Sequence, residues 1–122
     1  MRSAKISILV LIILAATVVA NSLYIRHVTD ELAKRVADVN TSDMEECAIE
    51  YKSLYSEFSK AERFISITVS HDDLTNIEES FADIIGAADA GLEGSVIMIK
   101  NRLEDALRHL GRLSSINLDS II

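Results

Sequence analysis

The 122-residue chain contains no proline and no tryptophan, and it has only four glycines. Average usage of roughly 5% would give about six prolines in a chain of this length. Proline and glycine are the residues that most often interrupt helices and strands. Their scarcity argues against a β-sandwich, a β-barrel or a proline-rich disordered chain, and it favours long helices. The length suffices for one domain.

Cysteine and positive charge are also scarce. The one cysteine, Cys47, cannot form an intrachain disulfide and cannot build a thiolate-rich zinc site. Twelve basic residues stand against 19 acidic ones, and no basic face of the kind that nucleic-acid-binding proteins carry stands out. We therefore predict no nucleic-acid partner. Because hydrophobic residues make up 49% of the chain, we nevertheless expect a folded protein.

Motifs of catalysis and cofactor binding are missing as well. Gly91 and Gly94 are not followed by the Lys-Ser or Lys-Thr pair of a phosphate-binding loop, and no Gly-x-Ser-x-Gly sequence occurs. None of the three histidines follows a glutamate by three residues, as di-iron bundles require. We predict a protein that is not an enzyme, with no catalytic, cofactor-binding or metal-ligating residue, no cofactor and no small-molecule substrate. A metal-dependent bundle built on His71, Asp72 and Asp73 is the enzyme-class alternative.

A long apolar run near the N-terminus is the most informative feature that the chain does have. Residues Ile6–Ile25 include twelve Leu, Ile or Val residues, and Arg26 ends the run. As a helix they would be about 30 Å long, which matches the hydrocarbon core of a bilayer. Their aliphatic side chains would contribute roughly −4 to −7 kcal/mol towards insertion. We predict a transmembrane signal-anchor over residues 1–25, in contact with membrane lipid through Ile6–Ile25, and a separate domain over residues 26–122.

Two other interpretations of this run remain open. A buried core helix would need cover around its whole circumference, which nothing else in the chain supplies. A signal peptide cleaved after Ala20 is the closer rival, because Arg2 and Lys5 form a basic segment before the apolar one. Cleavage would release a secreted soluble helical protein. Hydrophobicity resumes at Leu23–Ile25 and the helical pattern continues beyond it, so we favour the uncleaved anchor.

The orientation of the span depends on the charge of its flanks. Two basic residues precede the run and three follow it closely, so the numbers of Lys and Arg on the two sides are nearly equal. The segment from Arg26 onward carries 10 basic and 19 acidic residues, and long segments translocate largely regardless of charge. We predict a single-pass protein of the cytoplasmic membrane, with the N-terminus inside and the C-terminal domain outside.

The spacing of apolar residues along the chain predicts four helical stretches. Apolar residues at steps of three and four continue the N-terminal helix beyond the membrane. They are Ile25, Val28, Leu32, Val36 and Val39. On other faces of this helix, Asp30–Lys34 and Glu31–Arg35 are acid–base pairs one turn apart.

A second helix is predicted after a break at residues 40–43. Ser42 and Glu45 have the spacing of a capping box, so the helix should begin at Ser42. It carries the clearest heptad pattern in the chain, and Cys47 on this seam predicts a buried thiol, with an interchain disulfide as the alternative. The seam consists of Met44, Cys47, Tyr51, Leu54, Phe58, Ala61, Ile65 and Thr68. Residues Ile65–Ser70 alternate as a strand does, but a lone strand is not stable and we predict helix.

Two further helices follow. Ser70 or Asp72 is expected to cap the third helix, and residues 89–91 are expected to end it. Its seam consists of Leu74, Ile77, Phe81, Ile84 and Ala88. The seam of the fourth helix consists of Leu92, Val96, Ile99, Leu103, Ala106, Leu110 and Leu113. The apolar tail, residues 114–122, is expected to fold back over the bundle.

Charge is segregated between these last two helices. No Lys or Arg occurs over Phe64–Ile99, whereas Lys100, Arg102, Arg108 and Arg112 follow on the fourth helix. Short links force antiparallel neighbours, so the acidic and basic helices should pack side by side. We predict an all-α fold, in which an N-terminal transmembrane helix is followed by a small antiparallel helical bundle.

This layout resembles the domain-of-unknown-function family 4363, small single-span membrane proteins of Gram-positive spore formers. The resemblance rests on the basic N-terminus with one apolar span, on the block His71–Ser80 and on the apolar tail. The chain departs from the family in its second helix, where it has Tyr51, Tyr55 and Phe58 and no tryptophan. The resemblance implies a membrane location, a helical fold, no established activity, and a membrane protein as partner.

These observations together predict a membrane-anchored, non-enzymatic helical module for protein interaction or structural support at the outer face of the cytoplasmic membrane. Its partner would be a membrane protein or a second copy of the chain. The alternative is the secreted form released after Ala20. The block His71-Asp72-Asp73 is interpreted as a helix cap rather than a cation site. Glu78, Glu79 and Asp83 are interpreted as a solvated face rather than a carboxylate cluster.

Overall fold

The computed structural model describes residues 2–65 and 69–121, with side chains through residue 113. This part of the chain forms four α-helices and no strand: α1 (Arg2–Asp38), α2 (Met44–Ile65), α3 (His71–Asp89) and α4 (Glu93–Ile121). The predicted all-helical fold is confirmed. α1 includes both the apolar run and the first helix of the bundle without a break.

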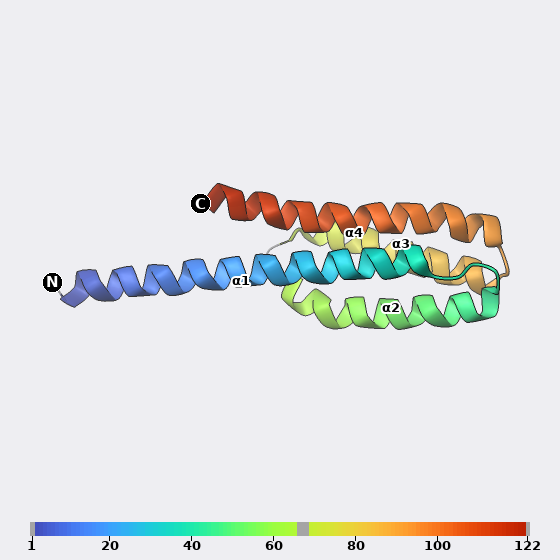
Figure 1. Ribbon diagram of the computed structural model, residues 1–122, viewed down its shortest axis with the longest axis horizontal. Helices are drawn as coiled ribbons and strands as arrows, with labels where there is room; N and C mark the ends of the chain where they lie inside the picture. Colours follow the sequence, from blue (N-terminus) through green and yellow to red (C-terminus); the bar gives the residue numbers. More distant parts are fainter. Residues whose placement is uncertain (1, 66–68, 122) are drawn as a thin grey trace.

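The four helices run along one common axis in alternating directions (Figure 1). Each helix packs on its neighbour in the chain, and α4 closes the bundle by packing more extensively on α1 than any other two helices pack. The N-terminal half of α1 projects beyond the ends of α2 and α3 (Figure 1). The acidic α3 and the basic α4 are neighbours, as the charge pattern predicted, and Arg102 Nη2 lies 3.0 Å from Asp83 Oδ2 across their boundary.

The core of the bundle is built on the predicted seams of α2 and α3. Tyr51, Phe58 and Phe81 are fully buried, and the ring centroids of Phe58 and Phe81 lie 5.7 Å apart. Every predicted seam residue of α3 is buried, and the seam of α2 is buried from Cys47 to Ile65. Met44 packs on its edge, while Thr68 lies outside the described residues.

The predicted seam of α4 needs two corrections. Leu92 is 53% exposed, because it lies in the turn before the helix rather than on its inner face. Leu107 is fully buried, although the predicted steps passed from Leu103 to Ala106 and Leu110. Ala106 and Leu107 are adjacent and therefore about 100° apart around the helix, so they lie at opposite borders of an apolar stripe about 100° wide. The larger side chain, Leu107, takes the interior position.

The cap of α2 is Asp43, so the prediction of Ser42 was wrong. Asp43 Oδ1 accepts hydrogen bonds from the backbone N–H groups of Glu45, at 3.1 Å, and Glu46, at 3.4 Å. Ser42 instead donates its own N–H to Asn40 Oδ1, at 3.0 Å, within the preceding turn. The carboxylate directly before Met44 reaches the free N–H groups of the first helical turn, as an N-cap must.

The turn between α3 and α4 closes on glycine, as predicted. Gly91 has φ of +73°, a left-handed conformation that glycine adopts without strain. The N–H of Leu92 donates to Ala87 O at 2.9 Å, and the N–H of Gly91 donates to Ala88 O at 3.1 Å. These two bonds form a Schellman motif, which satisfies carbonyls that the end of α3 leaves free.

The C-terminal tail does not fold back over the bundle, contrary to the prediction. α4 continues as a helix to Ile121 and runs beside α1 past the ends of α2 and α3 (Figure 1). No glycine or proline follows Gly111, so nothing in the tail interrupts the helix. The prediction of helix over Ile65–Ser70 was wrong for Val69 and Ser70, which lie between the end of α2 and the start of α3. Residues 66–68 and residue 122 lie outside the described residues.

Candidate functional site at the base of the bundle

The apolar run joins the bundle with no spacer between them. Side chains of the large apolar residues from Ile6 to Leu14 are 48–64% exposed, on all sides of α1. Val18 and Val19 are partly buried, and the first buried residues of α1 are Ser22 and Ile25, still within the apolar run. We call this level, from Ser22 to Arg26 on α1 and from Arg63 to Ile65 on α2, the base of the bundle.

An aromatic pair lies at the base. Tyr24 of α1 and Phe64 of α2 pack edge to face, with ring centroids 6.0 Å apart and planes at 78°. The two residues stay 43% and 50% exposed, respectively. They form one wall of an open, mainly apolar groove of about 500 Å³, whose other lining residues are Thr17, Ala20 and Asn21 of α1. The groove can accept an apolar chain or an aromatic group.

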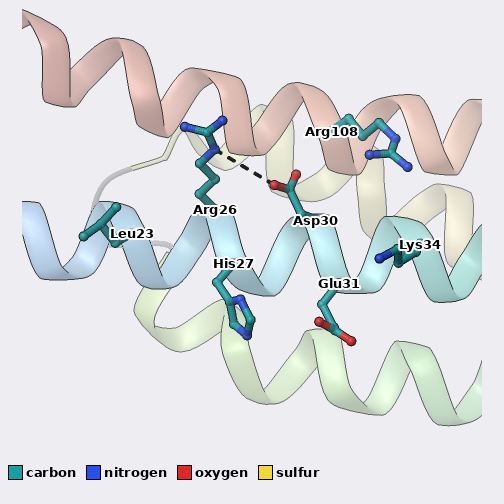
Figure 2. A pocket seen from close by; sticks show the side chains of 7 residues that line it. All are labelled: Leu23, Arg26, His27, Asp30, Glu31, Lys34 and Arg108. Atoms are coloured by element: carbon teal, nitrogen blue, oxygen red, sulfur yellow. Dashed lines mark ion pairs between the residues drawn. The ribbon is translucent and has the colours of Figure 1, made fainter.

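A second, charged groove lies between α1 and α4 and extends from the base along the bundle. Its volume is about 420 Å³, and Figure 2 shows its lining side chains. Arg26 lies on the side of α1 that faces α4, and Arg108 extends from α4 itself (Figure 2). His27 and Glu31 lie on the side of α1 that faces α2 (Figure 2). The lining residues are Leu23, Arg26, His27, Asp30, Glu31, Lys34 and Arg108.

Two of the three basic side chains of this charged groove, Arg26 and Arg108, lie beside acidic groups. Arg26 Nε lies 4.0 Å from Asp30 Oδ2, and Arg108 Nη2 lies 3.2 Å from Glu104 Oε1. Both pairs are partly exposed to solvent, where ion pairs contribute roughly 0–1 kcal/mol. The groove therefore presents mixed charge rather than a dedicated anion pocket.

Ion pairs between helices differ from the pairs that sequence spacing predicted. Arg35, expected to pair with Glu31 on its own helix, instead pairs with Glu57 of α2. Lys52 of α2 lies 3.4 Å from Asp89 of α3, measured from Nζ to Oδ1. Sequence spacing within one helix does not reveal such partners, because they depend on the register between two helices.

The block His71-Asp72-Asp73 contributes to a helix cap, but through Asp73 rather than Asp72. The cap residue is Ser70, whose Oγ accepts from the N–H of Asp73 at 3.3 Å and donates to Asp73 Oδ2 at 2.8 Å. Asp72 is exposed and takes no part in this exchange. Within the ranges that the structure describes, no three His, Cys, Asp or Glu side chains are grouped as metal ligands.

A carboxyl pair between α2 and α3 escaped the sequence analysis. Glu62 shares a side-chain hydrogen bond with Glu78, which raises the pKa of Glu62 to about 7, and burial and the charge of Glu78 act in the same direction. The predicted grouping of Glu78 with Glu79 and Asp83 on one solvated face missed this partner. The signal in the sequence was the absence of Lys and Arg over Phe64–Ile99, which leaves no cation on α3 to face Glu62.

Cys47 and Tyr51 are both fully buried on the seam of α2. Burial raises the pKa of the Cys47 thiol, and the charge of Glu50 adds to the effect. Burial likewise raises the pKa of Tyr51, whose hydroxyl donates to Val36 O at 3.3 Å. The predicted buried thiol is confirmed, and Cys47 stabilises the core as a small apolar side chain.

Comparison of the chain with protein-family models, with curated proteins and with solved structures gave no match. The function must therefore be inferred from the physical chemistry of the junction between the apolar helix and the bundle.

Proposed function

We propose that the chain is a single-pass protein of the cytoplasmic membrane, anchored by Ile6–Ile25. Its N-terminus lies on the inner side of this membrane and its bundle lies on the outer side. The observation that carries the proposal is the ring of exposed apolar side chains from Ile6 to Leu14. α1 is long and apolar enough to cross a bilayer. Transfer of apolar surface out of water stabilises by about 25 cal/mol per Å², and lipid would cover this ring on every side.

The bundle of the anchored protein acts as a non-enzymatic interaction or structural module. This part of the proposal is supported by its grooves, which are open and lined by paired charges or by apolar side chains. Its partner is a membrane protein or a second copy of the chain, and the resemblance to family 4363 belongs to the same proposal. Crosslinking in native membranes, followed by mass spectrometry of the crosslinked peptides, would identify the partner.

A secreted form released after Ala20 is the second candidate. It is favoured by one observation: the buried residues of α1 begin at Ser22, so cleavage would leave all of them in the bundle. Mass spectrometry of the mature chain separates the two candidates. The anchored form retains the apolar run, sediments with the membrane fraction and is released from it by detergent. A mature chain that begins at Asn21 would overturn the anchor.

The orientation requires its own experiment. Ser56 is exposed on α2, so Ser56→Cys should react with a membrane-impermeant maleimide on intact cells if the bundle lies outside. Ser3→Cys, at the other end of the span, is the matched control and should react only after the cells are permeabilised. Cys47 is fully buried and gives little background. The reverse labelling pattern would place the bundle inside.

A further inference from the structure

We infer that the base of the bundle is a lipid-binding surface that rests in the interfacial layer of the bilayer, with Phe64 of α2 as a second anchor beside the span. The inference rests on the proposed membrane anchor and assigns to the bundle a contact that the anchor alone does not require. Its ligand is the glycerol and headgroup region of phospholipids.

The geometry of α1 brings the base to the membrane surface. α1 continues unbroken through the end of the apolar run, and its first buried residue, Ser22, lies within that run. A rigid helix without a spacer holds the base at the depth where the hydrocarbon core ends. The level of Tyr24 on α1 is therefore the level of the interface.

Phe64 reaches that level from a different helix. It packs on Tyr24 with ring centroids 6.0 Å apart, yet half of its surface remains exposed. Tyrosine and tryptophan form belts at both interfaces of membrane proteins, where their rings contact the headgroup region, and Phe64 extends the aromatic surface of such a tyrosine, Tyr24. The apolar groove of about 500 Å³ that Phe64 forms with Thr17, Ala20, Asn21 and Tyr24 continues the lipid-facing surface of the span onto the bundle.

Charge complements this surface. Arg26 directly follows the apolar run, and Arg63 directly precedes Phe64. Arginine side chains near the end of a span extend their charge to the phosphate layer. The start of α3 adds the acidic Asp72 and Asp73 near the base, and the opposite end of the bundle carries Asp43, Glu45 and Glu46 at the start of α2. Both ends therefore carry acidic groups, and the base adds the arginines that an anionic bilayer attracts.

The path of α4 carries a further apolar segment past the base. α4 runs beside α1 past the ends of α2 and α3, along the apolar half of α1 (Figure 1). The residues in these last turns include Ile116, Leu118 and Ile121. Two helices, rather than one, therefore extend from the base toward the bilayer.

Tryptophan fluorescence tests the inference in the full chain, which has no tryptophan of its own. Phe64→Trp reports on the base, and its exposed ring site accepts the larger side chain. Leu9→Trp reports on the span. Ile49→Trp, at a 62% exposed position about 22 Å further along α2, reports on the opposite end of the bundle. Each variant is reconstituted into phosphatidylcholine–phosphatidylglycerol vesicles with brominated acyl chains, and circular dichroism verifies its helical content.

The expected result is a large loss of emission from Phe64→Trp, approaching that of Leu9→Trp, with a shift to shorter wavelength and no loss from Ile49→Trp. Quenching of Leu9→Trp without quenching of Phe64→Trp would overturn the inference and leave the anchor standing. A Phe64→Trp signal that is shielded from both brominated lipid and aqueous iodide would also overturn it, because a protein partner would then cover the base. Absence of quenching in Leu9→Trp would instead contradict the proposed anchor.

Discussion

Gly111 of α4 lies directly against Thr29 of α1. A Cβ atom placed at Gly111 would come within 2.7 Å of Thr29 Oγ1. Thr29 is fully buried, and its hydroxyl donates to Ile25 O at 2.8 Å, so the hydroxyl cannot turn away without losing that bond. The contact lies on the most extensive helix pair of the bundle, α1 with α4. Only a residue without a side chain allows the two helices to come this close.

The first prediction tests this close approach. Gly111→Ala should destabilise the bundle by about 1–3 kcal/mol, as overpacked core substitutions do. Gly86→Ala is the matched control, because a Cβ atom there would meet nothing within 4 Å. It should stabilise by about 0.4–1 kcal/mol through the reduced freedom of the unfolded chain. Denaturant unfolding in detergent, followed by circular dichroism, measures both. Equal effects of the two substitutions would contradict the contact.

The second prediction concerns the seam of α2. Leu54 and Phe58 are buried, so Leu54→Ala or Phe58→Ala should cost roughly 2–5 kcal/mol. Glu57 lies between them on the exposed face, where it pairs with Arg35. Glu57→Ala should change stability by no more than about 0.5 kcal/mol, the usual range for surface positions. Thermal melts that showed similar losses at all three positions would contradict the seam.

The third prediction separates a cap from a cation site at the start of α3. Ser70→Ala removes the hydroxyl that accepts from Asp73 N–H, and it should cost roughly 0.5–2 kcal/mol. Asp72→Ala should stay within about 0.5 kcal/mol, because Asp72 makes no contact in the cap. Melts with chelator and with excess calcium or zinc should coincide for the parent chain. A melting temperature that rises with either cation would contradict the cap.

The fourth prediction follows from the raised pKa of Glu62. The folded chain keeps this proton up to about pH 7, whereas an unfolded glutamate releases it at about pH 4.3. Between these values the folded state binds more protons, so the stabilisation due to the pair is lost as the pH rises. Glu62→Gln should flatten this decline, while Glu79→Gln, an exposed neighbour, should keep it. Urea unfolding over this pH range measures the slopes, and parallel slopes for Glu62→Gln and the parent would contradict the pair.

The fifth prediction concerns the Cys47 thiol. Its full burial and raised pKa should leave it unreactive toward a thiol reagent in the native chain and reactive once denaturant is added. Time courses with Ellman's reagent provide the measurement, and Ser56→Cys supplies a reactive control. Rapid reaction of the native parent chain, or a disulfide-linked dimer on a non-reducing gel, would contradict the buried position.

Periodicity in the sequence was enough to predict the helices and most of their inner faces, because apolar spacing decides which side of a helix avoids water. It predicted Phe58 and Phe81 as core, and the segregation of charge predicted α3 beside α4. It failed where neighbouring residues compete for one role. Ser42 and Asp43 can both cap a helix, and Ala106 and Leu107 both border the apolar stripe of α4.

Contacts between helices were beyond the sequence for a different reason. The pairs Arg35–Glu57 and Glu62–Glu78 depend on how far one helix is shifted along another, and periodicity within each helix leaves that shift undetermined. The close approach at Gly111 depends on the same shift. The tail was mispredicted because its apolar residues suggested cover for the bundle, whereas the unbroken helix carries them past it.

Because α1 is continuous, it also fixes how the bundle is rotated about the membrane normal relative to the span. Each residue of an α-helix turns the chain by about 100° and advances it by about 1.5 Å. One residue inserted after Ala20 would therefore swing the bundle by about 100° around the membrane normal relative to the span. An insertion of about seven residues, close to two full turns, would nearly restore the original rotational orientation of the bundle. It would move the bundle about 10 Å further from the membrane. A membrane protein that binds one side of the span would therefore also set the rotational orientation of the bundle about the membrane normal.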